Sequence, residues 1–481
     1  MRFDTSILQL PEIFFKRVAP VPVRDPYLIR LNRPLAAELG LDLPEDQEKL
    51  AGLFSGNTHW SGSDPVALAY AGHQFGHFVP ELGDGRAVLL GEVVTDQGER
   101  FDIQLKGAGQ TPFSRNGDGR SPLGPVIREY VVSEAMHALG VPTTRALAMV
   151  GSGEEVIRET IQPGALFTRV AASHLRVGTF EYCASRGDSE SVRRLADYVI
   201  DRHYPEVRTA ANPYAALFEA VCHAQARLVA RWMSVGFIHG VMNTDNTTLS
   251  GETIDFGPCA FMDAYDPTAV FSSIDHQGRY AYNNQPTIAQ WNMACLGGCL
   301  LPLLHEKTDM AHAEGERILG TFAPLFKDAY EDGMCAKIGV DALDEKDFDM
   351  VRSLLRLMHA DGVDFTLAFH RLTNDVQAFV QLFASGQAVE SWLAVRESRL
   401  AEHTLSSDRS LAMMRQANPV FIPRNHRVEE AIRAAEDHDD FSLTHRLIEI
   451  VSHPYGSQPE HAEYMDPPRP EERVRQTFCG T

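Results

Sequence analysis

The stretch that most constrains the fold of this chain is residues 237–257, which read FIHGVMNTDNTTLSGETIDFG. An Asp-Phe-Gly tripeptide closes it, and taken alone that tripeptide occurs by chance. Here it follows His239 and Asn246, and Lys106 and Glu129 precede them in the chain. The combination in this order, rather than any single motif, predicts the fold.

The same skeleton carries the active site of protein kinases, where H-x-D-x-x-x-x-N is followed by D-F-G. In kinases the first Asp is the catalytic base, and the Asn and the second Asp hold metal ions. In this chain Val241 stands where the catalytic Asp belongs. Two interpretations follow: the chain is an inactive kinase relative, or a neighbouring carboxylate serves a different chemistry.

The segment before this stretch has the pattern of a kinase N-lobe. The runs RAVLLGEVV and RFDIQLKG flank the turn TDQGE, which predicts a hairpin whose second strand ends at Lys106. The helix GPVIREYVVSEAMHALGV follows, with Pro125 at its start and Gly140 just past its end, and it carries Glu129. TRALAMV and EEVIRETI predict a second hairpin across GSGE.

A long helix, PYAALFEAVCHAQARLVARWMSV, comes next, and its apolar residues recur at helical spacing, so one face is buried. These elements predict an α+β, protein-kinase-like two-lobed fold with an N-terminal extension and a helical C-terminal region. The predicted divisions are a loop-rich extension over 1–80, a nucleotide-binding core over 81–340 (N-lobe about 81–170, C-lobe about 171–340), and a helical region with a flexible tail over 341–481.

The composition of the chain indicates which classes of binding partner and which cellular compartment to expect. The formal net charge of −21 argues against a nucleic-acid partner, because phosphate contacts need a basic surface, although a nucleotide needs only a local basic pocket. The first residues, MRFDTSILQL, lack a signal-peptide pattern, and no apolar run approaches the roughly 20 residues of a membrane span, so we expect no membrane association. The scattered, odd set of seven cysteines is typical of reduced thiols in a cytoplasmic enzyme.

Two residue pairs have spacings that occur in metal sites. His73 and His77 stand at i, i+4 in AGHQFGH, but no third ligand or general-base Glu accompanies them as in H-E-x-x-H, so we expect a structural role. We expect Cys295 and Cys299, in WNMACLGGCL, to be thiols in a helix core rather than metal ligands.

Several long and unusual segments resemble the selenoprotein O family. The resemblance runs from about residue 55 to the final CGT. The segments that carry it are YAGHQFG (70–76), LGDGRAVLLGE (82–92), QLKGAGQTPFSRNGDGRSPLGP (104–125), HGVMNTDN (239–246), IDFGPCAFMD (254–263), NNQPTIAQWN (283–292) and NPVFIPRNHRVEEAI (418–432).

This resemblance implies a kinase fold with a different activity, that of a protein adenylyltransferase. Such enzymes transfer AMP from ATP, with Mg²⁺ or Mn²⁺, to Ser, Thr or Tyr hydroxyls of protein substrates, and some also transfer UMP. ATP is implied to bind in the reverse of the kinase orientation. Eukaryotic relatives carry selenocysteine near the C-terminus, where this chain has Cys479.

The resemblance also assigns roles to particular residues. It implies that Asp245 accepts the proton of the substrate hydroxyl and that Asn246 and Asp255 hold the metal through oxygen atoms. Glu129 is implied to hold Lys106 in place against the phosphates. The implied nucleotide-binding residues are Gly83, Gly85, Arg86, Lys106, Asp118, Gly119, Arg169, Arg176 and Asp255.

The residue types near the expected hinge are compatible with ATP bound in the reverse of the kinase orientation. In a kinase the strand after the second hairpin leads to a hinge that binds adenine in an apolar slot. Here that region is ALFTRVAASHLRVGTFE, which contains Arg169 and Arg176. Arginine forks suit phosphate oxygens better than the edge of a base. From the residues alone, either phosphate binding or ion pairing at the surface explains these arginines.

Cys259 and Cys479 form a predicted redox pair. Cys259 follows the Asp-Phe-Gly tripeptide, in the segment that forms the activation loop of kinases, and Cys479 lies near the end of a polar tail. Because a flexible tail reaches a loop at small closure cost, we expect a regulatory disulfide between them.

Three functions of different classes remain. The favoured one is a protein adenylyltransferase. The second is a phosphotransferase with the kinase fold, against which Val241 counts. The third is an inert nucleotide-binding scaffold, against which the joint presence of Lys106, Asn246 and Asp255 counts.

Overall fold

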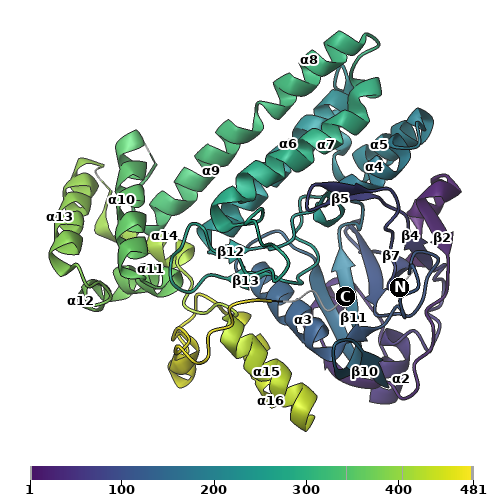
Figure 1. The fold of residues 1–481 in the computed structure, drawn as a ribbon, viewed down its shortest axis with the longest axis horizontal. Helices are drawn as coiled ribbons and strands as arrows, with labels where there is room; N and C mark the ends of the chain where they lie inside the picture. The colour runs from purple at the N-terminus through teal and green to yellow at the C-terminus, as the bar shows by residue number, and fades with distance from the viewer. Residues whose placement is uncertain (1–2, 343, 404, 478–481) are drawn as a thin grey trace.

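The computed structural model of the chain describes residues 3–342, 344–403 and 405–477. It has a mixed α/β fold with one large antiparallel sheet and many helices (Figure 1). The sheet strands lie in the first part of the chain, drawn purple to blue, whereas the green and yellow second half is helical. This segregation of strands and helices is the one expected of an α+β chain.

The main sheet has nine strands, and its path is β2-β4-β7-β8-β11-β10-β3, with β1 on β7 and β9 on β11. All of its strand pairs are antiparallel. The strands are β1 (Phe3–Asp4), β2 (Phe15–Arg17), β3 (Tyr27–Leu31), β4 (Val66–Leu68), β7 (Ala87–Val94), β8 (Arg100–Lys106), β9 (Ser121–Pro122), β10 (Arg145–Ile157) and β11 (Ile161–Ala171). Two short antiparallel pairs lie outside it, β5 (Gly72–Gln74) with β6 (His77–Val79) and β12 (Phe237–Ile238) with β13 (Ala260–Phe261).

Residues 1–80, the expected loop-rich extension, contribute β1 to β4 to the main sheet. β2 and β3 form the two ends of its strand path. These strands are only two to five residues long. So short a strand shows too little alternation of apolar and polar residues to be recognised in the sequence.

The first predicted hairpin is confirmed, but the second is wrong. β7 and β8 pair as predicted, and β8 ends at Lys106. The GSGE segment is not a turn, because β10 runs through it and pairs with β11 across a register shift between Gly151 and Glu155. The chain reverses just after β10, where the amide of Arg158 donates to the carbonyl of Thr160. Glycines mark bulges as well as turns, which explains the error.

Helices cover both faces of the sheet. Apolar side chains of α1 (Arg33–Glu38) and α2 (Gln47–Phe54) pack with those of β7, β8 and β10 in one cluster. On the other face α3 (Leu123–Ala138) packs against β10 and β11, and α15 (Asn425–His438) and α16 (Ser442–Val451) pack on α3. The C-terminal helices therefore return to the sheet, below α3 in Figure 1.

The helical half is arranged around α6 (Pro213–Ser234), the long amphipathic helix of the sequence analysis. The Asn212 side chain caps its start by accepting from the amides of Tyr214 and Ala215. It packs against α7 (Gln285–Leu304) and α9 (Phe322–Lys337). The other helices are α4 (Val177–Ala184), α5 (Ser189–His203), α8 (Thr308–Leu319), α10 (Glu345–Asp361), α11 (Phe365–Asn374), α12 (Val376–Val380), α13 (Gly386–Glu402) and α14 (Ser407–Ala417).

One helix in the described residues, Tyr282–Leu304, is long and apolar enough to cross a membrane when judged by length and composition alone. The sequence itself predicts no membrane span. Half of this stretch is buried inside the protein, where α7 packs against α4, α6 and α8. Burial of this kind is typical of a core helix.

Candidate active site

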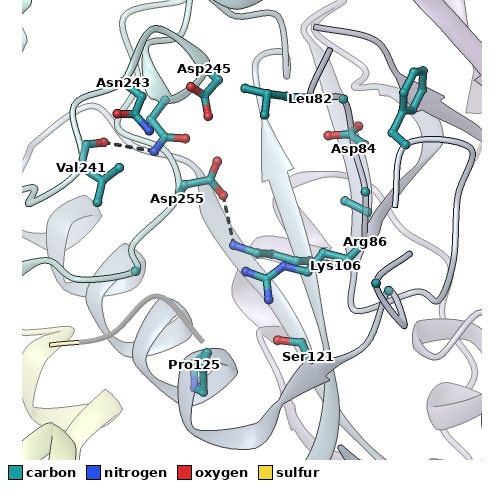
Figure 2. Close-up of a pocket in the computed structure, with 18 of the residues that line it drawn as sticks. Leu82, Asp84, Arg86, Lys106, Ser121, Pro125, Val241, Asn243, Asp245 and Asp255 are labelled. Atoms are coloured by element: carbon teal, nitrogen blue, oxygen red, sulfur yellow. Dashed lines mark hydrogen bonds and ion pairs between the residues drawn. The ribbon is translucent and has the colours of Figure 1, made fainter. Parts of the chain in front are cut away.

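A cavity of about 530 Å³ lies where the main sheet meets the helical half, and its size is that of an ordinary ligand site. Figure 2 shows side chains from both halves facing into it. The cavity brings together every residue that the sequence predicts to bind the nucleotide, hold the metal, accept the proton or support Lys106. They are Gly83, Gly85, Arg86, Lys106, Asp118, Gly119, Glu129, Arg169, Arg176, Asp245, Asn246 and Asp255.

Lys106 and Glu129 form a buried ion pair. Lys106 ends β8 and Glu129 lies on α3, and the Lys106 Nζ is 2.6 Å from the Glu129 Oε2. The same Nζ is 3.0 Å from the Oδ1 of Asp255, the contact drawn as a dashed line in Figure 2. The predicted support of Lys106 by Glu129 is therefore present as a direct contact between the two side chains.

Asp255 is surrounded by positive charge. Besides Lys106, the Nη1 of Arg169 lies 2.8 Å from its Oδ1, and the Nη1 of Arg176 lies 2.6 Å from its Oδ2. Burial alone would raise the pKa of Asp255, but the charges of Arg169, Lys106 and Arg176 hold it well below its ordinary value. Asp255 is therefore fully ionised at neutral pH. Its backbone has a φ of 63°, a conformation that non-glycine residues adopt rarely and mostly at special sites.

Both arginines that the sequence places near the cavity are buried rather than exposed. Arg169 lies on β11 with 1% of its surface exposed, and Arg176 precedes α4 with 3% exposed. The Arg176 guanidinium also stacks over the Tyr70 ring, 4.7 Å from its centre. The alternative of surface ion pairs is therefore wrong, and these two cations belong to the cavity wall.

Two glycine turns form part of the cavity wall. Gly83 has a φ of 68°, and a Cβ added to it would overlap the ring of Phe113. Gly119 has a φ of 69°, and its Cβ would overlap the backbone of Gly109. Both positions therefore require glycine, and the two loops lie with their backbones close to the cavity.

Asp118 has two arginine partners that no pattern in the sequence indicates. Its carboxylate accepts two hydrogen bonds from Arg158, at 2.8 and 3.1 Å, and one from the amide of Arg120. The bond from Arg158 lowers the pKa of Asp118. Both arginines line the cavity. Arg158 was missed because it belongs to the turn after β10, which the sequence analysis placed at GSGE.

Asp245 lies in a short 3₁₀ turn, Thr244–Asn246, with 7% of its surface exposed. Its Oδ2 accepts a hydrogen bond of 3.3 Å from the Nε2 of Gln74. Its Oδ1 is buried and has no hydrogen-bond partner within the described residues. Burial raises the pKa of Asp245 to about 6, although the charge of Arg176 opposes this. A carboxylate with a free oxygen and a pKa close to neutral is suited to accepting a proton.

Asn246 and His239 hold the loop that follows Val241. The Asn246 Nδ2 donates to the Val241 carbonyl at 3.1 Å, which leaves the amide oxygen to act as a ligand (Figure 2). The His239 Nε2 lies 2.9 Å from the carbonyl oxygen of Ile254, next to Asp255. His239 is fully buried, so its place in the motif is structural.

The contact between Gln74 and Asp245 was also missed. Gln74 ends β5 in the YAGHQFG segment, which the sequence analysis used only for the resemblance. Gly72 of the same strand lies so close that a Cβ there would overlap the Asp245 carboxylate. No pattern in the sequence indicates this contact, because the two segments are far apart along the chain.

The predicted redox pair is described only in part. Cys259 is buried beside the cavity loop, whereas Cys479 lies outside the described residues. Thr477, near the end of the described chain, donates through its Oγ1 to the carbonyl of Pro258 at 2.7 Å. The C-terminal segment therefore reaches the residue before Cys259.

The cavity brings together an ionised carboxylate, an amide oxygen and buried cations, a set of groups that suits a transferase with a nucleotide substrate. The family model described as protein adenylyltransferase SelO matches residues 1–452 of the chain. The chain is 58% identical, over all of its length and 98% of the relative's, to the protein nucleotidyltransferase YdiU of Maridesulfovibrio salexigens. It is 57% identical to the protein of the same name from Rhizobium meliloti, over 100% of this chain and 99% of that one. The chain belongs to the protein adenylyltransferase SelO family, as the resemblance predicted.

Proposed function

We propose that the enzyme transfers AMP from ATP to Ser, Thr or Tyr hydroxyls of target proteins and releases pyrophosphate. The observation that carries this proposal is the group of three cations around Asp255, one of which, Arg176, also contacts the backbone of Asp245. The family and the relatives' names support a nucleotidyltransferase that acts on proteins. The hydroxyl acceptor and the choice of ATP over UTP go beyond those names.

The buried arginines support binding of ATP in the reverse of the kinase orientation. Arg169 and Arg176 occupy the segment from the end of β11 to the start of α4, where a kinase would offer an apolar slot for adenine. Two buried guanidinium groups favour phosphate oxygens there and disfavour a base. With the β- and γ-phosphates at these cations, the α-phosphate faces the loop that carries Asp245.

The transfer then proceeds in one displacement. The carboxylate of Asp245 accepts the proton of the substrate hydroxyl, whose oxygen attacks the α-phosphorus. The bond from the α-phosphorus to the oxygen bridging to the β-phosphorus breaks, and its electron pair leaves with pyrophosphate. Lys106, Arg169 and Arg176 neutralise the charge that develops on this leaving group.

Asn246 and Asp255 are the residues that would hold Mg²⁺ or Mn²⁺. They fit such an ion, because Asp255 is ionised and the Asn246 amide presents its oxygen. A bound triphosphate would take over the cations that now contact Asp255 and free its carboxylate for the metal. When bound, the metal neutralises charge on the phosphate oxygens.

Val241 favours this reaction over phosphotransfer. It is buried and apolar at the position of the kinase base, so no carboxylate faces a γ-phosphate from that place. Asp245 disfavours an inert scaffold. Its buried carboxylate oxygen lacks a hydrogen-bond partner within the described residues, which costs stability, and such a costly group calls for a functional explanation.

The kinase-like, two-lobed arrangement is part of this proposal. The main sheet and α3 would form the N-lobe, about 81–170, and the helices around α6 the C-lobe, about 171–340. Residues 1–80 would complete the N-lobe sheet, and 341–481 would form the helical region. A cytoplasmic location agrees with the free thiols of Cys183, Cys222, Cys295, Cys299 and Cys335.

The test is the identity of both products. A target protein incubated with the enzyme, ATP and a divalent metal is analysed by intact mass spectrometry, while pyrophosphate and ADP are quantified. The proposal expects an adenylyl adduct on a Ser, Thr or Tyr hydroxyl and one pyrophosphate per adduct. A phosphoryl adduct with ADP release would refute it.

A further inference from the structure

A second cavity, of about 420 Å³, lies on the far side of β5 from Asp245 and shares no lining residue with the first. His73 enters it from β5, Glu181 from α4 and Cys295 from α7. One nitrogen, one carboxylate oxygen and one sulfur from these side chains all lie within 4.8 Å of one another. Three elements distant in sequence thus bring three different metal-ligating atoms to one point.

We propose that His73, Glu181 and Cys295 bind a divalent transition-metal ion of the Zn²⁺ type. An imidazole, a thiolate and a carboxylate together suit Zn²⁺, whereas Mg²⁺ takes oxygen ligands only. Three protein ligands that face a cavity leave a fourth, tetrahedral position for water. Binding replaces the thiol proton of Cys295, which passes to solvent.

The distances are compatible with such an ion. Bonds of about 2.0–2.3 Å to Zn²⁺ put tetrahedral ligand atoms roughly 3.3–3.7 Å apart. The Nδ1 of His73 is now 2.5 Å from the Oε1 of Glu181, and the three ligand atoms all lie within 4.8 Å of one another. The ligands would therefore shift by about 1 Å to admit the ion, which side-chain rotations supply.

The charge balance also favours a cation. Glu181 is a buried carboxylate with 4% of its surface exposed, and within the described residues its only ion-pair partner is His73. Burying an ionised carboxylate is costly unless positive charge compensates it. Burial raises the pKa of the Cys295 thiol to about 12, so this thiol stays protonated until an ion displaces the proton.

The proposed site connects to the active site through one hydrogen-bonded residue. The Thr244 Oγ1 donates to the Oε2 of Glu181 at 2.5 Å and accepts from the His73 amide at 2.7 Å. Thr244 directly precedes Asp245, and His73 directly precedes Gln74, which contacts Asp245. A bound ion would hold both segments against each other. This consequence for Asp245 rests on the proposed function, whereas the metal site itself does not.

The experiment uses Co²⁺ as a spectroscopic probe for Zn²⁺, with the full chain kept reduced under anaerobic conditions and without nucleotide. Thiolate ligation to Co²⁺ gives a charge-transfer band in the near ultraviolet, which a site made of oxygen ligands does not. The native protein is titrated beside Cys295→Ser and the matched control Cys299→Ser. Cys299 lines the same cavity one helical turn further along α7 but lies outside the ligand group.

We expect a charge-transfer band that saturates at one Co²⁺ per chain in the native protein and in Cys299→Ser. Cys295→Ser should lose the band. Its Kd for Co²⁺ should rise by more than the roughly 10–100-fold that is usual when a residue that only hydrogen-bonds to a metal ligand is removed. Circular dichroism checks that the variants are folded. A native protein without the band, a band that survives Cys295→Ser, or an equal loss in both variants would overturn the proposal.

Discussion

The Nη1 of Arg176 lies 2.6 Å from the Oδ2 of Asp255 and donates at the same distance to the backbone carbonyl of Asp245. One buried guanidinium therefore contacts both the proposed metal ligand and the residue proposed as the base. In the absence of nucleotide this cation is paired with Asp255. Bound phosphate would compete for it, which links nucleotide binding to the release of the metal ligand.

Replacing either buried arginine should weaken ATP binding. Each of Arg169→Ala and Arg176→Ala removes a charge-assisted phosphate contact worth about 1.5–3 kcal/mol, so the Kd for a non-hydrolysable ATP analogue should rise roughly 10–100-fold. Isothermal titration calorimetry measures this. The control is Arg193→Ala, since Arg193 is exposed on α5 and pairs only with surface acids in the described structure.

Lysine variants at the same two positions separate loss of the phosphate contact from loss of the fold. Arg169→Lys and Arg176→Lys keep the charge beside Asp255 but lose the guanidinium fork. They should fold normally and bind ATP with intermediate affinity. ATP binding unchanged in both alanine variants would rule out the assignment of these arginines to phosphate.

Asp245→Asn should reduce AMP transfer roughly 10²–10⁴-fold, the usual contribution of a positioned general base. The Kd for ATP should change little, because Asp245 is assigned to the hydroxyl. The base acts when it is deprotonated, and its pKa is raised to about 6, so the native kcat/KM should rise with pH up to about 6 and then level off. A pH profile that keeps this limb in Asp245→Asn would show that another group is responsible.

The same substitution should stabilise the fold at neutral pH. Because the folded state raises the pKa of Asp245, it binds the proton more tightly than the unfolded state, and stability falls as pH rises from about 4 to about 6. Asp245→Asn removes this penalty. The free energy of unfolding in urea should increase by up to about 3 kcal/mol at pH 7, and the gain should shrink below pH 6.

Asp188→Ala is the control, because it should lower the free energy of unfolding where Asp245→Asn should raise it. Asp188 caps α5 by accepting from the amide of Ser191, and losing such a cap costs about 1 kcal/mol. This variant should be less stable than the native protein at pH 7. If Asp245→Asn were destabilised as well, the raised pKa of Asp245 would be refuted.

Much of the site could be predicted because its parts lie in recognisable local patterns. Lys106 ends a strand of a hairpin, and Glu129 lies in a helix with clear start and stop signals, so their pairing follows from the order of elements. The pattern at 237–257 placed Asn246 and Asp255 together in the same way. The predicted boundaries of β8 and α6 agree with the structure for the same reason.

The remainder depends on tertiary contacts or on ambiguous signals. Glycine occurs in bulges and in turns, so GSGE predicted a turn where β10 continues, and the true turn with Arg158 was missed. Gln74 meets Asp245 only because β5 packs on the 3₁₀ turn. His73 and His77 do not share a helix face despite their i, i+4 spacing, since they lie on the two strands of the β5–β6 pair.

The predicted disulfide between Cys259 and Cys479 is tested by peptide mapping without reduction after mild oxidation. The hydrogen bond from Thr477 to Pro258 brings the described end of the chain next to Cys259, which supports the pairing. A cross-linked peptide that disappears on reduction is expected, while Cys222, buried in α6, should remain a free thiol. Free alkylation of both Cys259 and Cys479 under oxidising conditions would contradict the prediction.

The orientation of ATP is tested most directly by a variant that restores the kinase carboxylate. Val241→Asp places an acid where a kinase has its base. In the proposed orientation of ATP, however, the γ-phosphate lies away from this position, at Arg169 and Arg176. Native protein and variant are incubated with a target protein and with ATP labelled at either the α- or the γ-phosphate. Transfer of the α-label only, by both proteins, is the expected result. Appreciable transfer of the γ-label by Val241→Asp would mean that ATP binds in the ordinary kinase orientation, which contradicts the proposed mechanism.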